Sequence, residues 1–185
     1  MKVVVIGSGI VGASAAYYLA RKKVDVTIVD NEHQGNATAA GAGVVSPWLS
    51  DRGDLWYEIA KHGARYYHTL VSDLADDGET HTGYKKVGTL YVSKDEAELA
   101  EMCAALEEKK LDAPEIGDIQ LLSPEQARDK FPPLYEEFGA VFVSGGARVD
   151  GRLLRDALKR AAQKHHAKFI QGIAELVHQE HKVVG

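Results

Sequence analysis

A glycine-rich turn between two aliphatic runs constrains the fold of this chain more than any other feature of its sequence. The run Val3–Ile6 has the continuous aliphatic character of a parallel strand that is covered on both faces, and the glycine turn Gly7–Gly12 follows it directly. The residues Ile10–Arg21 contain no proline and several small residues, which predicts a helix that packs closely on a sheet. A second strand is predicted over Val24–Val29 and leads into Asp30. This order predicts a βαβ unit in an α/β fold.

The spacing Gly7-x-Gly9-x-x-Gly12 gives each glycine a separate task. Gly7 permits the tight turn from the strand, Gly9 leaves room for a pyrophosphate beside the backbone, and Gly12 lets helix and strand pack closely. Asp30 falls at the end of the second strand, where a carboxylate accepts hydrogen bonds from an adenosine ribose and disfavours a 2′-phosphate. The sequence therefore predicts a dinucleotide site for NAD or FAD rather than NADP, and the glycine turn alone does not choose between those two.

Composition narrows the function classes. The 185 residues carry a formal charge of −5 and no long basic run, which argues against nucleic-acid binding. No apolar segment approaches the roughly 20 residues that a membrane-spanning helix needs. The start of the chain leads into a strand and the glycine turn rather than a signal-peptide cleavage site. The single cysteine, Cys103, excludes an intrachain disulfide and fits a reducing compartment, so we expect a soluble, cytoplasmic protein.

The remaining pattern predicts two domains that are interleaved in sequence. We expect a first part of one domain over 1–80, an inserted segment over 81–143 and a return to the first domain over 144–185. Helices are predicted over Asp54–Leu74, Lys94–Lys110, from Pro124 onward and over Arg152–Lys164. Strands are predicted over Gly139–Val143 and Ala167–Ile170, with a strand or hairpin over Tyr84–Val92 and another near Lys182.

Two further segments carry a family resemblance. Asn36–Pro47, rich in alanine and glycine, resembles the flavin-approach loop of the D-amino-acid oxidase and glycine oxidase family. This family of FAD-dependent amine oxidoreductases includes D-amino-acid dehydrogenases and sarcosine oxidases. Gly145–Leu158 resembles the place where such chains leave the substrate domain and re-enter the FAD domain through a helix. The resemblance implies a Rossmann-like FAD-binding βαβ domain with an inserted α+β substrate-domain segment. Since the family's members are about twice as long, it also implies that the C-terminal half is missing here.

The resemblance also implies which residues contact FAD. Contacts to the diphosphate are expected from Gly7, Gly9, Ile10, Val11 and Gly12, and contacts to the adenosine ribose from Asp30 and Asn31. Ala37 and Thr38 match the start of a short helix at the phosphates or ribityl chain, Ala42, Gly43 and Val44 match backbone against the isoalloxazine, and Glu175 matches a backbone contact to adenine. Small residues suit the positions beside the flavin, because a bulky side chain would hold the ring away.

Other candidate groups have alternative explanations. Some relatives attach flavin through a histidine just beyond this loop, whereas Ser46–Leu49 stand here, so we expect noncovalent FAD. No His, Cys or Asp cluster has the spacing of metal ligands, so no metal is expected. Trp48 and Trp56 either border the substrate cavity or pack between the two domains, and Arg52 is either a carboxylate contact or an exposed loop charge. No catalytic residue is assigned.

The resemblance implies an enzyme that oxidises the C–N bond of an amino acid or amine by hydride transfer to flavin, with the D-amino acid, glycine and sarcosine classes as expected substrates. The arginine that grips the substrate carboxylate is expected in the later half of such enzymes. Two alternatives stay open: a non-catalytic nucleotide-binding or interaction module, for which unpaired sheet edges would favour a homo-oligomer, and an NAD-dependent dehydrogenase.

Overall fold

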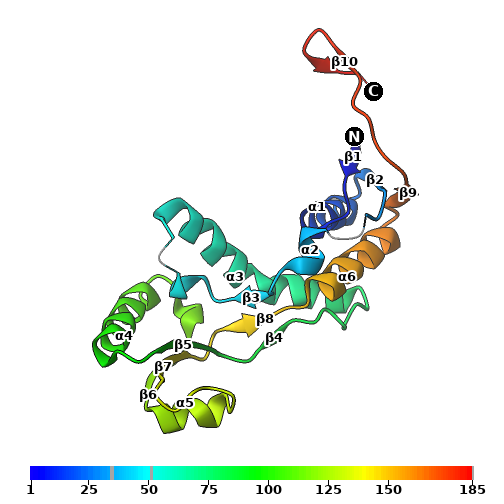
Figure 1. The fold of residues 1–185 in the computed structure, drawn as a ribbon. Helices are drawn as coiled ribbons and strands as arrows, with labels where there is room; N and C mark the ends of the chain where they lie inside the picture. Colours follow the sequence, from blue (N-terminus) through cyan, green and yellow to red (C-terminus); the bar gives the residue numbers. More distant parts are fainter. Residues whose placement is uncertain (34–35, 51, 185) are drawn as a thin grey trace. The chain divides into compact units, whose positions relative to one another are not determined.

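A three-stranded parallel sheet carries the glycine turn. In the computed structural model, which describes residues 1–33, 36–50 and 52–184, β1 (Lys2–Ile6) pairs with β2 (Asp25–Asp30), and β2 pairs with β9 (Lys168–Gln171). Helix α1 (Ile10–Arg21) connects the first two strands, and α6 (Gly151–Lys164) precedes the third (Figure 1). The predicted βαβ unit, the α1 boundaries and the third strand are thereby confirmed.

Small residues let α1 and α6 pack on each other beside this sheet. Both helices bury an alanine-rich face: Ala13, Ala16 and Ala20 in α1, and Ala157, Ala161 and Ala162 in α6. A Cβ on Gly12 would lie 3.3 Å from the Val5 side chain of β1, so the helix approaches the strand closely. Asp150 caps α6 by accepting hydrogen bonds from the backbone N–H groups of Arg152 and Leu153.

A polar cluster holds the end of α3 (Asp54–Asp76) against these two helices. The Tyr17 hydroxyl donates to Asp77 Oδ2 at 2.7 Å, and His165 Nε2 lies 2.9 Å from Asp77 Oδ1. The Arg21 guanidinium pairs with Asp73 at 2.6 Å. Because Tyr17 is fully buried and its hydroxyl meets a carboxylate, this contact fixes the end of α3 on α1.

The chain divides into two compact units. The first unit comprises residues 1–42, 71–83 and 150–185, and the second comprises 43–70 and 84–149. The second unit contains two small sheets of three strands each. The domain boundaries expected from the sequence stay a prediction, since compactness does not show that a segment folds by itself.

The larger sheet of the second unit is antiparallel and carries the core of that unit. β5 (Thr89–Ser93) and β6 (Ile119–Leu122) flank β7 (Gly139–Val143), and α4 (Glu96–Lys110) packs against all three. α5 (Pro124–Lys130) begins with a full capping box on Ser123. The buried core contains Trp48, Leu99, Leu106, Ala113, Ile116, Val141 and Val143, with η2 (Pro114–Ile116) contributing to it.

The smaller sheet corrects one expectation. β4 (Lys85–Lys86) pairs with β8 (Ala147–Arg148), and β3 (Val44–Val45) pairs with the other edge of β8. The hairpin alternative for Tyr84–Val92 is therefore wrong, because β4 and β5 take separate partners far along the chain. Strand β6 was not predicted from the sequence.

The remaining elements are α2 (Ala37–Ala40), η1 (Pro47–Leu49) and the hairpin of β10 (His178–Gln179) and β11 (Lys182–Val183).

Among the described residues, none of the helices combines the length and the apolar character needed to cross a bilayer.

Candidate nucleotide-binding site

The glycine turn has the backbone geometry that its sequence predicts. The Gly7 N–H donates to the Val29 carbonyl at 2.8 Å, which ties the end of β1 to β2, and Gly7 has a φ of +91°, a value that favours glycine. A Cβ on Gly12 would lie 2.0 Å from the Gly7 carbonyl oxygen. No side chain larger than hydrogen fits that contact, so the turn depends on Gly12 for its shape.

The N-terminus of α1 is open to an anion. Gly9 is the N-cap residue and offers no side chain to the helix, and no acidic residue occupies the first turn. The Ile10 N–H donates to the Thr38 hydroxyl oxygen at 3.0 Å. Because a helix N-terminus carries partial positive charge, this end favours a phosphate, and Thr38 places a hydroxyl group beside it.

Asp30 lies beside the glycine turn at the end of β2. Its carboxylate accepts hydrogen bonds from the backbone N–H groups of Ser8 and Glu32. Burial acts to raise the pKa of Asp30, but these two hydrogen bonds and the charge of Lys159 outweigh it and lower the pKa below its ordinary value. The carboxylate is therefore ionised at neutral pH and is an acceptor for ribose hydroxyls.

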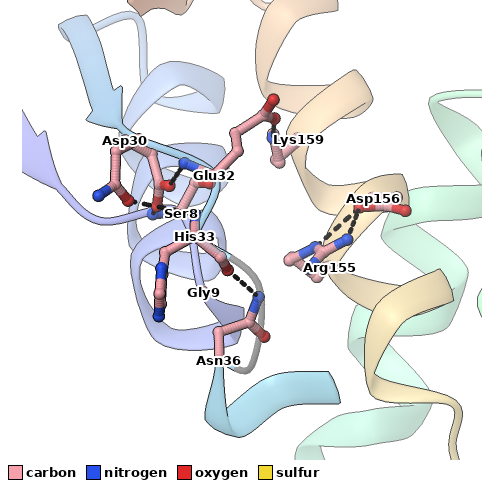
Figure 2. A pocket seen from close by; sticks show the side chains of 10 residues that line it. Ser8, Gly9, Asp30, Glu32, His33, Asn36, Arg155, Asp156 and Lys159 are labelled. Atoms are coloured by element: carbon pink, nitrogen blue, oxygen red, sulfur yellow. Dashed lines mark hydrogen bonds and ion pairs between the residues drawn. The ribbon is translucent and has the colours of Figure 1, made fainter. Parts of the chain in front are cut away.

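A pocket of about 510 Å³ opens beside these groups (Figure 2). Of the residues that the sequence places at the cofactor, Gly9, Asp30 and Asn31 line it, and Ser8 joins them from the glycine turn. The other predicted contacts in the turn, Gly7, Ile10, Val11 and Gly12, lie in the segment that carries Gly9.

Helix α6 adds two cations to this pocket that the sequence analysis missed. Arg155 and Lys159, four residues apart on one helix face, both line it. Lys159 pairs with Glu32 at 3.0 Å and Arg155 with Asp156 at 2.7 Å, as Figure 2 shows. Their spacing of one helical turn was the available signal, but the packing of α6 on α1 and the pairing of β9 with β2 bring α6 to the glycine turn.

The short helix α2 is positioned from both sides. The Asn36 side chain accepts the Ala39 N–H at 3.1 Å and donates to the His33 carbonyl at 3.3 Å. A Cβ on Gly151 would lie 2.7 Å from the Thr38 carbonyl oxygen, so α2 lies directly against the start of α6. These contacts fix Ala37 and Thr38, the two predicted contacts in α2, within the first unit.

The predicted flavin-facing segment falls at a boundary between the units. Ala42 ends the first stretch of the first unit, whereas Gly43 and Val44 belong to the second. Gly43 has a φ of +70°, and a Cβ there would lie 1.9 Å from the Val149 carbonyl oxygen. The Val44 side chain is 67% exposed.

Glu175 is exposed in the segment between β9 and β10 and is not among the residues that line the pocket of the first unit.

The second unit has a pocket of its own, of about 500 Å³. Its wall contains Val44, Ser46, Arg52, Trp56 and Tyr67. Trp48 is buried in the core of the second unit, whereas Trp56 and Arg52 line this pocket. Within residues 1–33, 36–50 and 52–184, no group of three or more His, Cys, Asp or Glu side chains is placed to hold a metal ion.

The pocket of the first unit fits the ADP portion of FAD. It combines an ionised carboxylate for ribose hydroxyls, a helix N-terminus whose first turn holds no acidic residue, for phosphate, and two nearby cations. The close contact at Gly12 holds the turn in the shape that exposes these backbone groups.

Comparison with known proteins gives consistent matches. A family model described as FAD dependent oxidoreductase, DAO, matches residues 2–185. YurR of Bacillus subtilis (strain 168), described as an uncharacterized oxidoreductase, is 44% identical over 183 residues, which are 98% of this chain and 49% of YurR.

Two solved structures show the same fold. The iminodiacetate oxidase from Chelativorans sp. BNC1 is 42% identical with a TM-score of 0.91, over 97% of this chain and 49% of that one. The glycine oxidase from Bacillus cereus is 24% identical with a TM-score of 0.80, over 100% of this chain and 50% of that one. The chain thus spans about half the length of the relatives it matches.

Proposed function

Because this chain belongs to the DAO family of FAD-dependent oxidoreductases, we propose that the protein oxidises the C–N bond of an amino acid or amine, with FAD held noncovalently. The family's cofactor is FAD. The observation that supports this proposal best is the pocket of the first unit, where Asp30 and the N-terminus of α1 offer complementary groups to ribose and diphosphate.

Within this proposal the first unit binds the ADP portion of the cofactor. Asp30 and Asn31 accept and donate hydrogen bonds at the ribose, and the backbone from Gly7 to Gly12 receives the diphosphate. Thr38 holds the Ile10 N–H through its oxygen and keeps its own proton available for a phosphate oxygen. Arg155 and Lys159 reduce the cost of bringing two negative charges into the pocket.

When bound, FAD supplies a hydride acceptor for the carbon that bears the amine. The chain's own contribution is to align that carbon, and we propose that the backbone at Ala42, Gly43 and Val44 forms part of the aligning surface. The exposure of Val44 and the tight backbone contact at Gly43 agree with a fixed, uncovered edge. An imine formed from the amine would then hydrolyse in water.

The names of the relatives support a substrate of the amino-acid type. The protein with 42% identity is an iminodiacetate oxidase, and a more distant structural neighbour is a glycine oxidase. Both names refer to an amine whose neighbouring carbon carries a carboxylate. We therefore propose glycine-like secondary or primary amino acids, including N-substituted glycines, as the first substrates to test.

Flavin content tests the cofactor assignment. The purified protein should show flavin absorbance that heat denaturation releases as free FAD, and after depletion it should recover that absorbance with FAD but not bind NAD. Oxidation of glycine, sarcosine, iminodiacetate and D-amino acids should then be followed by loss of flavin absorbance without oxygen. A colourless protein that binds NAD, or neither nucleotide, would contradict the proposal.

A further inference from the structure

The pocket of the second unit, here called the Arg52 pocket, contains one charged side chain. Its wall is otherwise built from apolar and hydroxyl-bearing residues, among them Val44, Ser46, Trp56 and Tyr67. Arg52 is the sole ionisable cation and no acidic residue accompanies it among the described residues that line the pocket. A volume of about 500 Å³ lies within the range of small-molecule sites.

The Arg52 side chain lies over an aromatic face. Its guanidinium carbon is 5.1 Å from the centroid of the Trp56 ring. The backbone N–H of Arg52 donates to the Ser50 hydroxyl oxygen at 3.3 Å. No carboxylate pairs with the guanidinium within the described part of the chain, unlike Arg65 in the same unit, which pairs with Glu115 at 3.1 Å. The planar donors of Arg52 match an incoming carboxylate in a two-point geometry, and no described carboxylate occupies them.

Two further residues of the same wall, Ser46 and Tyr67, support the binding of a ligand. The Ser46 hydroxyl oxygen is buried and has no hydrogen-bond partner among the described residues. A buried hydroxyl without a partner costs free energy, which a polar ligand or a water molecule would recover. Tyr67 is held in place by stacking on Tyr84, with ring centroids 5.0 Å apart and planes inclined by 9°. The pocket thus has a fixed aromatic wall and unsatisfied polar capacity.

The position of Val44 orients a substrate in this pocket. Val44 lines the same pocket and belongs to the segment that we propose to align the reacting carbon. Arg52 belongs to a different segment of the same wall, beyond η1 and beside Trp56, so the wall offers one place for the reacting carbon and another for an acidic group.

We propose that Arg52 binds a second carboxylate of the substrate, one that is not attached to the reacting carbon, and that the substrates are N-substituted amino acids with two acid groups. This inference rests on the proposed function. It makes Arg52 a specificity-determining residue whose donors select the acidic arm, while Trp56 supports the guanidinium from the opposite face.

Two pairs of small molecules show the effect of the second carboxylate, because within each pair only one molecule carries it. Iminodiacetate and sarcosine are both N-substituted glycines, and only iminodiacetate carries the second acid. Glutarate and butyrate have the same two shapes with carbon in place of the amine nitrogen, so they bind without being oxidised. The enzyme with bound FAD should be titrated with glutarate and butyrate, with flavin absorbance as the readout, and assayed with iminodiacetate and sarcosine.

The variant Arg52→Gln should raise the KM for iminodiacetate at least tenfold and leave its kcat within about twofold. Its KM for sarcosine should change less than twofold, and the tighter binding of glutarate over butyrate should disappear. Arg52→Lys should fall between Arg52→Gln and the wild type, since a lysine keeps the charge but not the planar donors. The control Lys94→Gln removes one positive charge from an exposed side chain of the same unit, paired with Glu137, and should change none of these values.

Several results would overturn the inference. They are a wild-type enzyme that oxidises sarcosine but not iminodiacetate, equal losses for both substrates in Arg52→Gln, or an unchanged preference for glutarate. If only this inference fails, Arg52→Gln still retains FAD. If the proposed function fails, the wild-type protein binds no FAD or oxidises no amine.

Discussion

The two pockets have nearly the same volume and opposite chemistry. The pocket of the first unit, about 510 Å³, is lined by carboxylates, cations and amides, including Asp30, Glu32 and Lys159. The pocket of the second unit, about 500 Å³, has apolar walls and one described charge, Arg52. The first is suited to a polar cofactor held by many directed hydrogen bonds, and the second to a small molecule selected by shape and one ion pair.

The difference also concerns how each site is built. The nucleotide pocket takes its shape from backbone, since Gly7 and Gly12 set the turn and the N-terminus of α1 supplies donors. The Arg52 pocket takes its chemistry from side chains on α3 and on the loop residues that flank η1, Arg52 among them. Substitutions in the first pocket should therefore affect folding and cofactor together, whereas those in the second should affect substrate alone.

The substitution Gly12→Ala should break the first site most severely. Its Cβ would lie 2.0 Å from the Gly7 carbonyl oxygen, which neither backbone segment can accommodate without moving. We expect a loss of about 3 kcal/mol in unfolding free energy, measured by urea denaturation, and loss of bound flavin. Gly172→Ala is the matched control, because a Cβ there meets no atom within 4 Å. Equal stability and flavin content in both variants would refute the packing argument.

Removal of the Asp30 carboxylate should weaken FAD binding with a smaller effect on the fold. The proposed hydrogen bonds from ribose to this carboxylate would be charge-assisted, and loss of such contacts costs about 1.5–3 kcal/mol, or roughly 10- to 100-fold in affinity. Asp30→Ala should show this change in fluorescence titrations of flavin-depleted protein with FAD. Asp25→Ala, at the exposed start of the same strand, should bind FAD like the wild type. Similar affinities for all three proteins would remove Asp30 from the site.

The polar cluster at Tyr17 should affect stability without affecting the cofactor. Tyr17→Phe removes the buried hydrogen bond to Asp77 and should cost about 1.5 kcal/mol in urea denaturation, with FAD affinity unchanged. The control Tyr135→Phe alters an exposed ring and should have no effect.

The same cluster predicts a pH dependence. Burial and the hydrogen bond to Asp77 raise the pKa of Tyr17 above its ordinary value of 10.0. Above pH 10 the unfolded state therefore loses this proton while the folded state keeps it, so the stabilisation falls as pH rises. The difference in unfolding free energy between the wild type and Tyr17→Phe should be constant below pH 9 and shrink above pH 10. A difference that grows with pH would contradict this assignment.

The smallest effect is expected at Lys159. Its ammonium group pairs with Glu32 at the pocket, and pairs near the surface contribute up to about 1 kcal/mol. Lys159→Gln should lower FAD affinity by roughly two- to fivefold at low salt and less at high salt, because ions screen the attraction. Lys168→Gln, which removes an exposed lysine on β9, should leave the affinity unchanged. A salt-independent loss would point to a packing effect over Phe169 instead.

The first site was largely predictable because its determinants are local. The positive φ of Gly7 and the close approach at Gly12 follow from residues within one turn of chain, and Asp30 follows on the next strand. Arg155 and Lys159 were not predictable, because they enter the site through the packing of α6 on α1 and the pairing of β9 with β2. No spacing rule in the sequence expresses that distant pairing.

The second unit shows the same limit more strongly. β4 and β5 follow each other closely in sequence, yet Lys85 pairs with Arg148 and Leu90 with Phe142. Register between strands so far apart depends on the packed core around them rather than on a local turn, so the sequence left a strand and a hairpin open, and the hairpin does not form. Arg52 carried two interpretations until the structure placed its side chain over Trp56 at a pocket.

The central claim is that the glycine turn of the first unit holds the ADP portion of FAD. Amide chemical-shift mapping of the flavin-depleted protein during titration with ADP tests it most directly, because ADP lacks the flavin ring. The account predicts saturable shifts of the Ser8, Gly9 and Ile10 amides, with the amides of Ser46 and Arg52 in the second unit unchanged. Saturable shifts confined to the second unit, or none at the turn, would contradict it.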